Sequence, residues 1–442
     1  MTSAPERFAA AIRNETVSKA ITSGTARALA KRAVRYKEEP DWDGLRERAR
    51  IAKARAIATL DERLLELEAR VALRGGRVHW APDAEAARRI VVEIARARGV
   101  RRVLKSKSMV GEEIEVNAAL EAAGIQPIET DLGEFIVQIA RGKPTHIIGP
   151  AMDWTRQGVG RLFAEKLGVP YTEDIPELTY IARRHLREPF LAAEMGISGA
   201  NFAVSETGTF VVLENEANAR LTTRQPPIHL VLMGIEKVVG TLDELGDLLY
   251  ILPRTATGQK MTVYVNHFTG SDREFHLVLL DNGRTRVLAD ERRRDLLQCI
   301  RCGACLNVCP VYQSVGGGPY DWTYPGPIGI ALSPLQRGPA AAEVTGASSL
   351  CGACTAICPV KIDLAHHILR GRAQKGRRFP VAKKVAFFVF RAVVSNPSLY
   401  ALAARIARLV GPRVWPPGWT RYRTPVVPAP KTFREMWREG IR

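Results

Sequence analysis

The stretch Cys299-Ile-Arg-Cys302-Gly-Ala-Cys305-Leu-Asn-Val-Cys309-Pro310 organises the last third of this sequence of 442 residues. Its cysteines follow the spacing C-x2-C-x2-C-x3-C-P, which bacterial proteins use to hold iron–sulfur clusters. Thiolates two residues apart can surround one cluster within a tight loop, and the three-residue step directs the fourth thiolate elsewhere. Zinc sites rarely place four cysteines in one run closed by proline. The run therefore predicts iron–sulfur ligation.

A second run, Cys351-Gly-Ala-Cys354-Thr-Ala-Ile-Cys358-Pro359, repeats the end of this pattern without its leading cysteine, whose place is taken by Ser348. In proteins with two such runs, the fourth cysteine of each run binds the cluster of the other. We therefore expect one complete ligand set and one set of three. The complete set is Cys299, Cys302, Cys305 and Cys358, and the set of three is Cys309, Cys351 and Cys354.

The set of three leaves one iron without a thiolate, because each [4Fe–4S] cluster takes four and the whole sequence has seven cysteines. Ser348 or Ser349 could bind that iron through oxygen. The iron could instead carry water or a ligand from a partner, or it could be absent, which would make the cluster [3Fe–4S]. We favour the open or oxygen-ligated iron over the [3Fe–4S] form.

The sequence before the cysteines alternates short apolar runs with amphipathic stretches. Strands are expected at 77–81, 100–104, 126–131 and 146–151, and helices at 84–98, 112–123 and 156–166. This alternation predicts a parallel sheet covered by helices, and therefore an α/β fold. Further strands are expected at 201–205, 209–214, 228–233, 261–266 and 275–280, with a hairpin turn at 205–208.

Four regions follow from these patterns. They are a helical segment at 1–75, the α/β domain at 76–290, the iron–sulfur domain at 291–380 and a basic tail at 381–442. In the first region apolar residues recur at helical spacing, at Leu60, Leu64, Leu65, Leu67 and Val71. We interpret this region as a scaffold or partner-contacting segment without chemistry of its own.

The positive charge is concentrated near the C-terminal end. The sequence carries a net charge of +18, and residues 360–442 contain 18 Lys and Arg against 3 acidic residues, which gives +15. Such a tail can bind an acidic protein or an anionic membrane surface, or it can simply be solvated. Nucleic acid is not an expected partner, because the Lys and Arg residues there lack an interleaved aromatic platform outside Trp415 and Trp419.

The apolar residues of 385–410 are interrupted by Arg391, Pro397 and Arg405, so no membrane span is expected. The first 20 residues lack the apolar core of a signal peptide. We therefore expect a cytoplasmic protein, with a tail able to contact the inner face of the cell membrane.

Two polar segments of the α/β region are candidate binding sites. Residues 201–220 surround the expected hairpin and could line a pocket at the ends of the strands, or could be a solvated turn. Ser106-Lys107-Ser108 precedes a helix, as in anion sites, although Glu112 and Glu113 argue against a strongly anionic ligand.

The sequence contains neither G-x-G-x-x-G nor G-x-x-x-x-G-K-[ST], and no catalytic arrangement stands out. Catalytic residues are therefore unknown, and we expect the substrate chemistry on another subunit or on a further cofactor. His146 and His229 lie in apolar patterns and are expected to be buried structural histidines.

Motifs along most of the chain resemble the lactate-utilisation protein B family, the iron–sulfur subunits of a bacterial system for L-lactate oxidation. The motifs are Ser106–Met109 with Glu112-Glu113, Glu129–Glu134, Gly199–Gly208, Tyr324–Gly329 and Ser348–Cys354. The resemblance implies a NagB/RpiA/CoA-transferase-like α/β domain, an α-helical ferredoxin-like domain with two [4Fe–4S] clusters, and a short C-terminal domain. It also implies that the missing eighth cysteine is a family feature.

The resemblance makes L-lactate the expected electron donor and other lactate-utilisation subunits the expected partners. The leading hypothesis is an electron-transfer subunit of an oxidoreductase complex that converts L-lactate to pyruvate. The alternatives are the iron–sulfur subunit of a glycolate or other 2-hydroxy-acid oxidase, and a ligand-binding protein whose clusters sense redox state.

Overall fold

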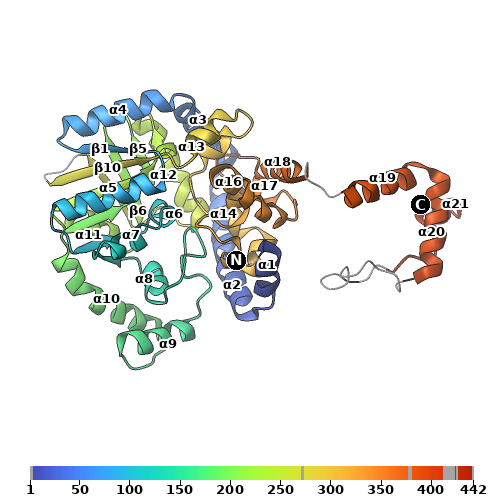
Figure 1. Cartoon of the computed structure of the whole chain (residues 1–442), viewed down its shortest axis with the longest axis horizontal. Helices are drawn as coiled ribbons and strands as arrows, with labels where there is room; N and C mark the ends of the chain where they lie inside the picture. Colours follow the sequence, from blue (N-terminus) through green and yellow to red (C-terminus); the bar gives the residue numbers. More distant parts are fainter. Residues whose placement is uncertain (1–2, 270–272, 377–380, 412–423, 425–426, 441–442) are drawn as a thin grey trace. The chain divides into compact units, whose positions relative to one another are not determined.

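The computed structural model describes residues 3–269, 273–376, 381–411, 424 and 427–440 (Figure 1). Its internal contacts divide the chain into two units, Met1–Arg372 and Ala373–Arg442. The first unit holds the α/β region and all seven cysteines.

Helices fill the N-terminal region, as expected from its sequence. They are α1 (Ala4–Ile12), α2 (Glu15–Glu38), α3 (Trp42–Ala58) and α4 (Leu60–Leu73). The side chains of Asn14 and Asp41 accept the backbone N–H groups of Val17 and Gly44 and so begin α2 and α3. The apolar stripe of α4 is buried against strands of the α/β region. Four of the five expected apolar positions thus pack into the protein, whereas Leu65 is 64% exposed.

A six-stranded parallel sheet forms the centre of the α/β region and confirms the expected fold class. Its strand order is β1 (Arg77–Ala81), β10 (Glu274–Leu280), β7 (Ile228–Gly234), β4 (Met195–Ser198), β2 (Arg102–Lys105) and β3 (Gln126–Glu129). Every residue of β7 is buried. Leu230 and Leu232 pack in one apolar cluster, and Val231 and Met233 pack in another on the opposite face. Both faces of the sheet are therefore covered.

The helices of the α/β region pack around this sheet. They are α5 (Ala84–Ala97), α6 (Met109–Glu113), α7 (Val116–Ala122), α8 (Leu132–Ile139), α9 (Arg156–Leu167), α10 (Ile175–Ala192), α11 (Asn218–Arg224), α12 (Leu242–Ala256) and α13 (Arg284–Ala289). The sequence patterns anticipated α5 and α9, but α8 and α10 were not predicted.

A second, four-stranded sheet was also not anticipated. Its order is β8 (Val238–Val239), β5 (Phe202–Val204), β6 (Thr209–Glu214) and β9 (Tyr264–Thr269). β5 and β6 pair antiparallel around Gly208, which adopts a φ of +66°, so the expected hairpin at 205–208 is confirmed. The predicted strand at 261–266 begins three residues later than expected.

The strand predicted at 146–151 is wrong, because this apolar segment folds into a turn. The Nδ1 atom of His146 accepts the N–H groups of Ile148 and Gly149 at 3.0 and 3.1 Å, and Thr145 donates to the carbonyl of Pro150. The imidazole therefore satisfies two backbone donors that a strand would have paired with a neighbour.

The helix predicted at 112–123 is broken into α6 and α7. Glu115, between them, has a φ of +52°, in the left-handed region that interrupts a right-handed helix. Helix α6 begins earlier than predicted, at Met109, because the side chain of Ser108 accepts the N–H of Gly111.

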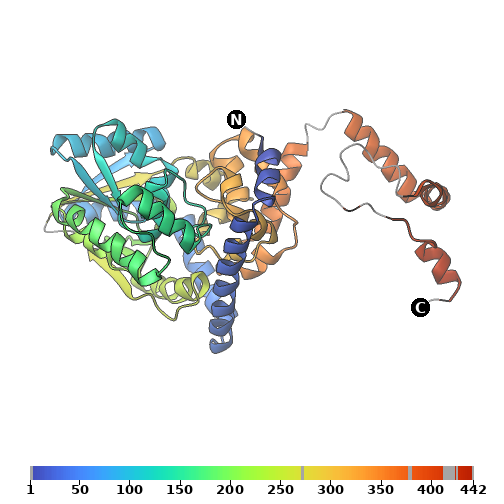
Figure 2. The same cartoon turned by 90° about the horizontal axis from the view of Figure 1, so that it is seen from below.

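Short helical pieces make up the cysteine segment. They are η2 (Arg294–Gln298), α14 (Ala304–Asn307), α15 (Pro310–Val315), η3 (Gly318–Tyr320), α16 (Gly326–Gln336), η4 (Pro339–Gly346), α17 (Ala353–Ile357) and α18 (Leu364–Gly376). Helices α1 and α2 lie alongside this segment (Figure 2), and Ile21, Trp42 and Leu45 share its apolar core. The first and last thirds of the first unit thus pack together.

The second unit contains α19 (Val381–Ser395), α20 (Pro397–Val410) and α21 (Phe433–Arg438). Phe387, Phe388, Phe390 and Leu409 are exposed on the first two helices. Within the described residues no one helix has the length and hydropathy to span a membrane; α19 and α20 meet these criteria only as a pair, bent by 107°. The Trp415–Trp419 stretch noted in the sequence falls outside the described residues.

A candidate iron–sulfur site and an adjoining cavity

Four cysteines from the two runs line one small cavity. They are Cys299, Cys302, Cys305 and Cys358. Burial raises the pKa of Cys302, and the neighbouring sulfurs of Cys299 and Cys358 raise it further. The structure thus brings the fourth cysteine of the second run to the first three of the first run.

The other three cysteines form a second group. Burial and the nearby sulfurs of Cys309 and Cys351 raise the pKa of Cys354 to about 11. Cys351 is exposed, and the hydroxyl of Ser349 donates to its sulfur and lowers its pKa. This group reaches the protein surface, whereas the first group is largely enclosed.

Both groups have the surroundings that iron-bound thiolates require. The backbone N–H of Ile362 donates to the sulfur of Cys358 at 3.4 Å. Backbone N–H groups also reach the sulfurs of five other cysteines: Cys302, Cys305, Cys309, Cys351 and Cys354. Such donors stabilise the negative charge of thiolates around a cluster. The residues present therefore fit two iron–sulfur clusters.

The two cysteine runs adopt the same local backbone. Arg301 precedes Cys302, and Leu350 precedes Cys351, which is the equivalent cysteine of the second run. Their φ values are +59° and +56°. Gly303 and Gly352, which directly follow these two cysteines, have φ values of +73° and +80°. By this correspondence Ser348 occupies the place of Cys299. Its hydroxyl accepts the N–H of Leu350 at 3.1 Å.

Two arginines of the N-terminal helices hold the second run, which the sequence interpretation of residues 1–75 missed. Arg46 donates through Nη2 to the carbonyls of Cys358 and Ala356, at 2.9 and 3.1 Å. Arg32 donates to the carbonyl of Ile357 at 3.3 Å. The helical pattern carried no signal for this role, because the contacts join residues more than 300 positions apart in the chain.

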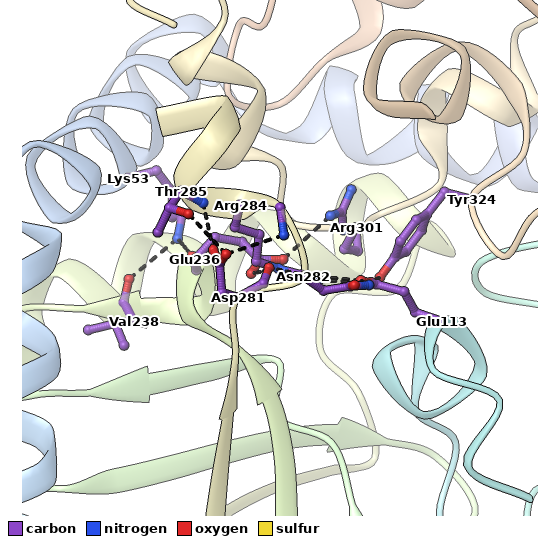
Figure 3. A network of polar contacts seen from close by, with 11 residues as sticks. Lys53, Glu113, Glu236, Val238, Asp281, Asn282, Arg284, Thr285, Arg301 and Tyr324 are labelled. Carbon is purple, nitrogen blue, oxygen red and sulfur yellow. Dashed lines mark hydrogen bonds and ion pairs between the residues drawn. The ribbon is translucent and has the colours of Figure 1, made fainter. Parts of the chain in front are cut away.

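A buried ionic network lies beside the first cysteine loop (Figure 3). Arg284 pairs with Glu113 and Glu236, and Arg301 lies 3.4 Å from a carboxylate oxygen of Glu236. Burial would raise the pKa of Glu236, but Arg284 and Arg301 outweigh it and lower the value to about 2. Tyr324 donates to Glu113 at 2.7 Å. The carboxylate of Glu113 therefore already has its ionic and hydrogen-bond partners, Arg284 and Tyr324, within this chain.

A cavity of about 350 Å³ adjoins this network. Both polar segments singled out in the sequence contribute to it, so the 201–220 segment lines a pocket and is not merely a solvated turn. The polar and charged lining includes Lys107, Ser108, Asp131, Asn201, Glu214, Asn215, Glu216, Asn218, Lys237, Gln259, Arg301 and Tyr324. Arg301 and Ile147 also line the small cavity of the first cysteine group, so the two sites share these residues.

Three carboxylates surround the buried ammonium of Lys105. Its Nζ lies 2.5 Å from Glu112, 2.6 Å from Glu129 and 3.8 Å from Glu134. Burial and the charge of Glu129 raise the pKa of Glu134. The ammonium supplies one positive charge among these three carboxylates.

His146 and His229 are both buried, as expected. Burial lowers the pKa of each to about 3. His229 lies in β7 and contacts the hydroxyl of Ser198 at 2.8 Å, whereas His146 lies in the turn described above and contacts Asn307 at 3.0 Å. Both are neutral structural groups.

The fold and the thiols define a class of protein in which an α/β domain with a parallel sheet is joined to a domain for two iron–sulfur clusters. Family models agree with each part. A model described as "LUD domain" matches residues 64–282, one described as "4Fe-4S dicluster domain" matches 295–362, and one described as "Lactate utilisation protein B, C-terminal" matches 360–440.

Curated relatives extend over nearly the whole chain. Lactate utilization protein B of Bacillus cytotoxicus is 39% identical over 98% of this chain and 96% of its own length. The protein of the same name from Oceanobacillus iheyensis is 37% identical over 99% of this chain and 96% of its own. The chain belongs to the lactate utilization protein B family.

One solved structure also matches part of the chain. It is a DUF162 family protein from Deinococcus radiodurans, 15% identical, which covers 50% of this chain and 98% of its own with a TM-score of 0.27. This likeness is too distant to define the fold.

Proposed function

We propose that this chain is the iron–sulfur electron-transfer subunit of a complex that oxidises L-lactate to pyruvate. Full-length relatives named for lactate utilisation support the substrate. The observation that carries the electron-transfer role is the pair of adjacent thiol groups, one enclosed and one reaching the surface at Cys351. When bound, the clusters supply one-electron transfer.

Within this function, Cys299, Cys302, Cys305 and Cys358 hold a [4Fe–4S] cluster. Cys309, Cys351 and Cys354 hold the second, whose fourth position is open or taken by an oxygen ligand, with a [3Fe–4S] form as the alternative. The cavity shared by the first four thiols supports this grouping. The placement of Ser348 at the position equivalent to Cys299 supports the oxygen ligand.

The α/β domain is related to the NagB/RpiA/CoA-transferase-like folds, and the cluster domain is ferredoxin-like. The domain limits are those given by the sequence, at 1–75, 76–290, 291–380 and 381–442. The change from the mixed α/β elements to short helices after α13 supports the limit near 290.

The basic tail docks the protein in the cytoplasm, on an acidic partner subunit of the lactate-utilisation system or on the inner face of the membrane. The +15 charge of residues 360–442 supports this role, as do the exposed phenylalanines of α19. A helix with both features suits a charged and partly apolar surface.

Electron paramagnetic resonance of anaerobically purified protein tests the proposed function. The spectrum is recorded before and after adding L-lactate together with candidate partner subunits. We expect the signal of reduced clusters to appear only with lactate and partners. Clusters that stay oxidised under every combination would contradict the proposal. Parallel oxidation assays with glycolate, in a strain lacking this protein, separate lactate from other 2-hydroxy acids.

A further inference from the structure

The cavity beside the first cysteine loop contains a cation that its own chain leaves partly unpaired. Arg301 is 7% exposed, and its Nε and Nη1 atoms are buried without a hydrogen-bond partner among the described residues. Only Nη2 has an ionic partner, Glu236, at 3.4 Å. Buried donors are rarely left unsatisfied, because each loses its hydration without compensation. Arg301 also lies near the sulfur of Cys299, and its Nε and Nη1 atoms remain available to an acceptor that is not among the described residues.

Lys237 lines the same cavity and is also buried. Within the part of the chain that the structure describes, its ammonium makes no hydrogen bond or ion pair. The carboxylate of Glu214, by contrast, is occupied, since it accepts the N–H groups of Ala219 and Arg220 and the amide of Asn266. Asp131 is likewise occupied as the cap of α8. Hydrogen-bond donors of the chain therefore already occupy the carboxylates of Glu214 and Asp131, and burial together with these two charges raises the pKa of the third lining carboxylate, Glu216.

The cysteine loop itself does not require an arginine at position 301. Leu350 occupies the equivalent position of the second loop with nearly the same φ, +56° against +59°. The first loop alone carries a charged side chain there, and that side chain faces both the cavity and the first group of thiols. The ring of Tyr324, 4.2 Å from the guanidinium carbon, holds the arginine in place.

We propose that this cavity binds an organic anion whose acidic group is held by Arg301 and Lys237, against the first cysteine loop. Its volume, about 350 Å³, lies in the range of small-molecule sites. Ser108, Asn201 and Asn218 line the rest of it and suit hydroxyl or carbonyl groups. The anion is either the carboxylate of a short 2-hydroxy or 2-oxo acid, or the phosphate of a redox cofactor.

The inference deepens the proposed function, because it places the binding of the acid or of its electron acceptor in this chain. The choice of probes rests on the proposed function. Binding is measured by isothermal titration of the cluster-loaded, full-length protein under anaerobic conditions. The probes are L-lactate, pyruvate and flavin mononucleotide, used separately.

Two variants each remove one of the cations, and a third variant is the matched control. Arg301→Leu introduces the residue that the second loop already carries, and Lys237→Met keeps the length of the side chain without its charge. Lys166→Met, on α9 and outside this cavity, is the control. We expect at least one probe to bind the unmodified protein and the control, and its affinity to fall about tenfold or more in each variant, as for loss of a charge-assisted hydrogen bond.

The iron content of each variant shows whether its clusters are retained, and Lys237→Met keeps the test valid if Arg301→Leu fails to load them. Failure of all three probes to bind the unmodified protein would overturn the proposal. The proposal would also be overturned if the variants bound the probes as tightly as the unmodified protein while the reduction potential of their clusters shifted. The two cations would then only balance the charge of the thiolates. Reduction of the clusters by lactate and partners in the absence of any binding here would leave the proposed function standing and remove this inference alone.

Discussion

Cys302 and Cys309 belong to the same run, yet they lie in different groups of thiols. Cys302 shares its cavity with Cys358 of the second run, and Cys309 lies near Cys351. We therefore predict that Cys302→Ser removes one cluster and Cys309→Ser the other, because each loses a different thiolate. Electron paramagnetic resonance of the reduced variants measures which signal disappears. Loss of the same signal in both variants would show that the crosswise grouping is wrong.

Ser348 occupies the position at which the first run has Cys299. Ser348→Cys should supply the missing thiolate, and we predict slower loss of the second cluster in air, since thiolates are the usual ligands of these irons. The rate is followed by visible absorbance and by iron content. Ser395→Cys, on an exposed residue of α19 in the second unit, is the control. Equal rates in the parent protein and in Ser348→Cys would argue against an open position next to Ser348.

His229 makes stability depend on pH, because burial lowers its pKa to about 3 from an ordinary value near 6.5. Below pH 6.5 the unfolded chain binds a proton that the folded chain excludes. The free energy of unfolding therefore falls with acidification, by about 1.4 kcal/mol per pH unit, down to the folded pKa. Above pH 6.5 this contribution vanishes.

We predict that His229→Gln loses about 1.4 kcal/mol less stability than the parent protein between pH 7 and pH 5.5, since glutamine does not titrate. Denaturant unfolding at the two pH values measures the difference. The exposed His366→Gln serves as the control. An identical pH dependence in the parent protein and His229→Gln would show that this histidine is not held neutral.

At the scale of elements, helix α3 supports the second cysteine run through hydrogen bonds from Arg46. Its guanidinium donates to two carbonyls at the end of that run. Hydrogen bonds to a charged group contribute about 1.5–3 kcal/mol, so Arg46→Met should lower the free energy of unfolding by roughly that amount. It should also speed the loss of the first cluster to an iron chelator.

Arg55→Met is the matched control, because Arg55 lies on the same helix and is exposed. Chelation kinetics that are the same in both variants would mean that α3 supports the cluster loop only through its apolar contacts.

At the scale of the whole molecule, the division into two units has a direct consequence. All seven cysteines lie in the first unit, and the exposed apolar helices α19 and α20 lie in the second. We predict that a chain ending at Phe379 keeps both clusters and loses binding to partner subunits or anionic vesicles. That binding should weaken with salt in the full chain, since exposed charges are screened beyond about 8 Å at physiological ionic strength.

Co-sedimentation at low and high salt measures the binding, and iron content measures the clusters. If the shortened chain binds as well as the full chain at both salt concentrations, the tail is a solvated surface. If it loses its clusters, the second unit is needed to hold the first together.

Much of the cluster site could be predicted because cysteine spacing is a local property. The distance along the chain from Cys299 to Cys305 fixes which thiols can surround one cluster, and the count of seven excludes two full sets. The hairpin at 205–208 and the parallel sheet followed in the same way, from turn residues and from the period of apolar positions. The turn at His146, by contrast, looked like a strand, because its apolar pattern does not reveal that an imidazole satisfies the backbone.

The sequence by itself determined the class of fold, the cluster-binding residue types and the family. Tertiary structure decided which distant residues contact one another. It places Arg46 beside the second cysteine run, and it places Arg301 and Lys237 in one cavity with the 201–220 segment. These contacts join residues tens to hundreds of positions apart, and no local pattern encodes which ones will pack together. Burial then gives them their chemistry, since the guanidinium of Arg301, solvated in the unfolded chain, keeps inside the fold two N–H groups, at Nε and Nη1, without a partner among the described residues.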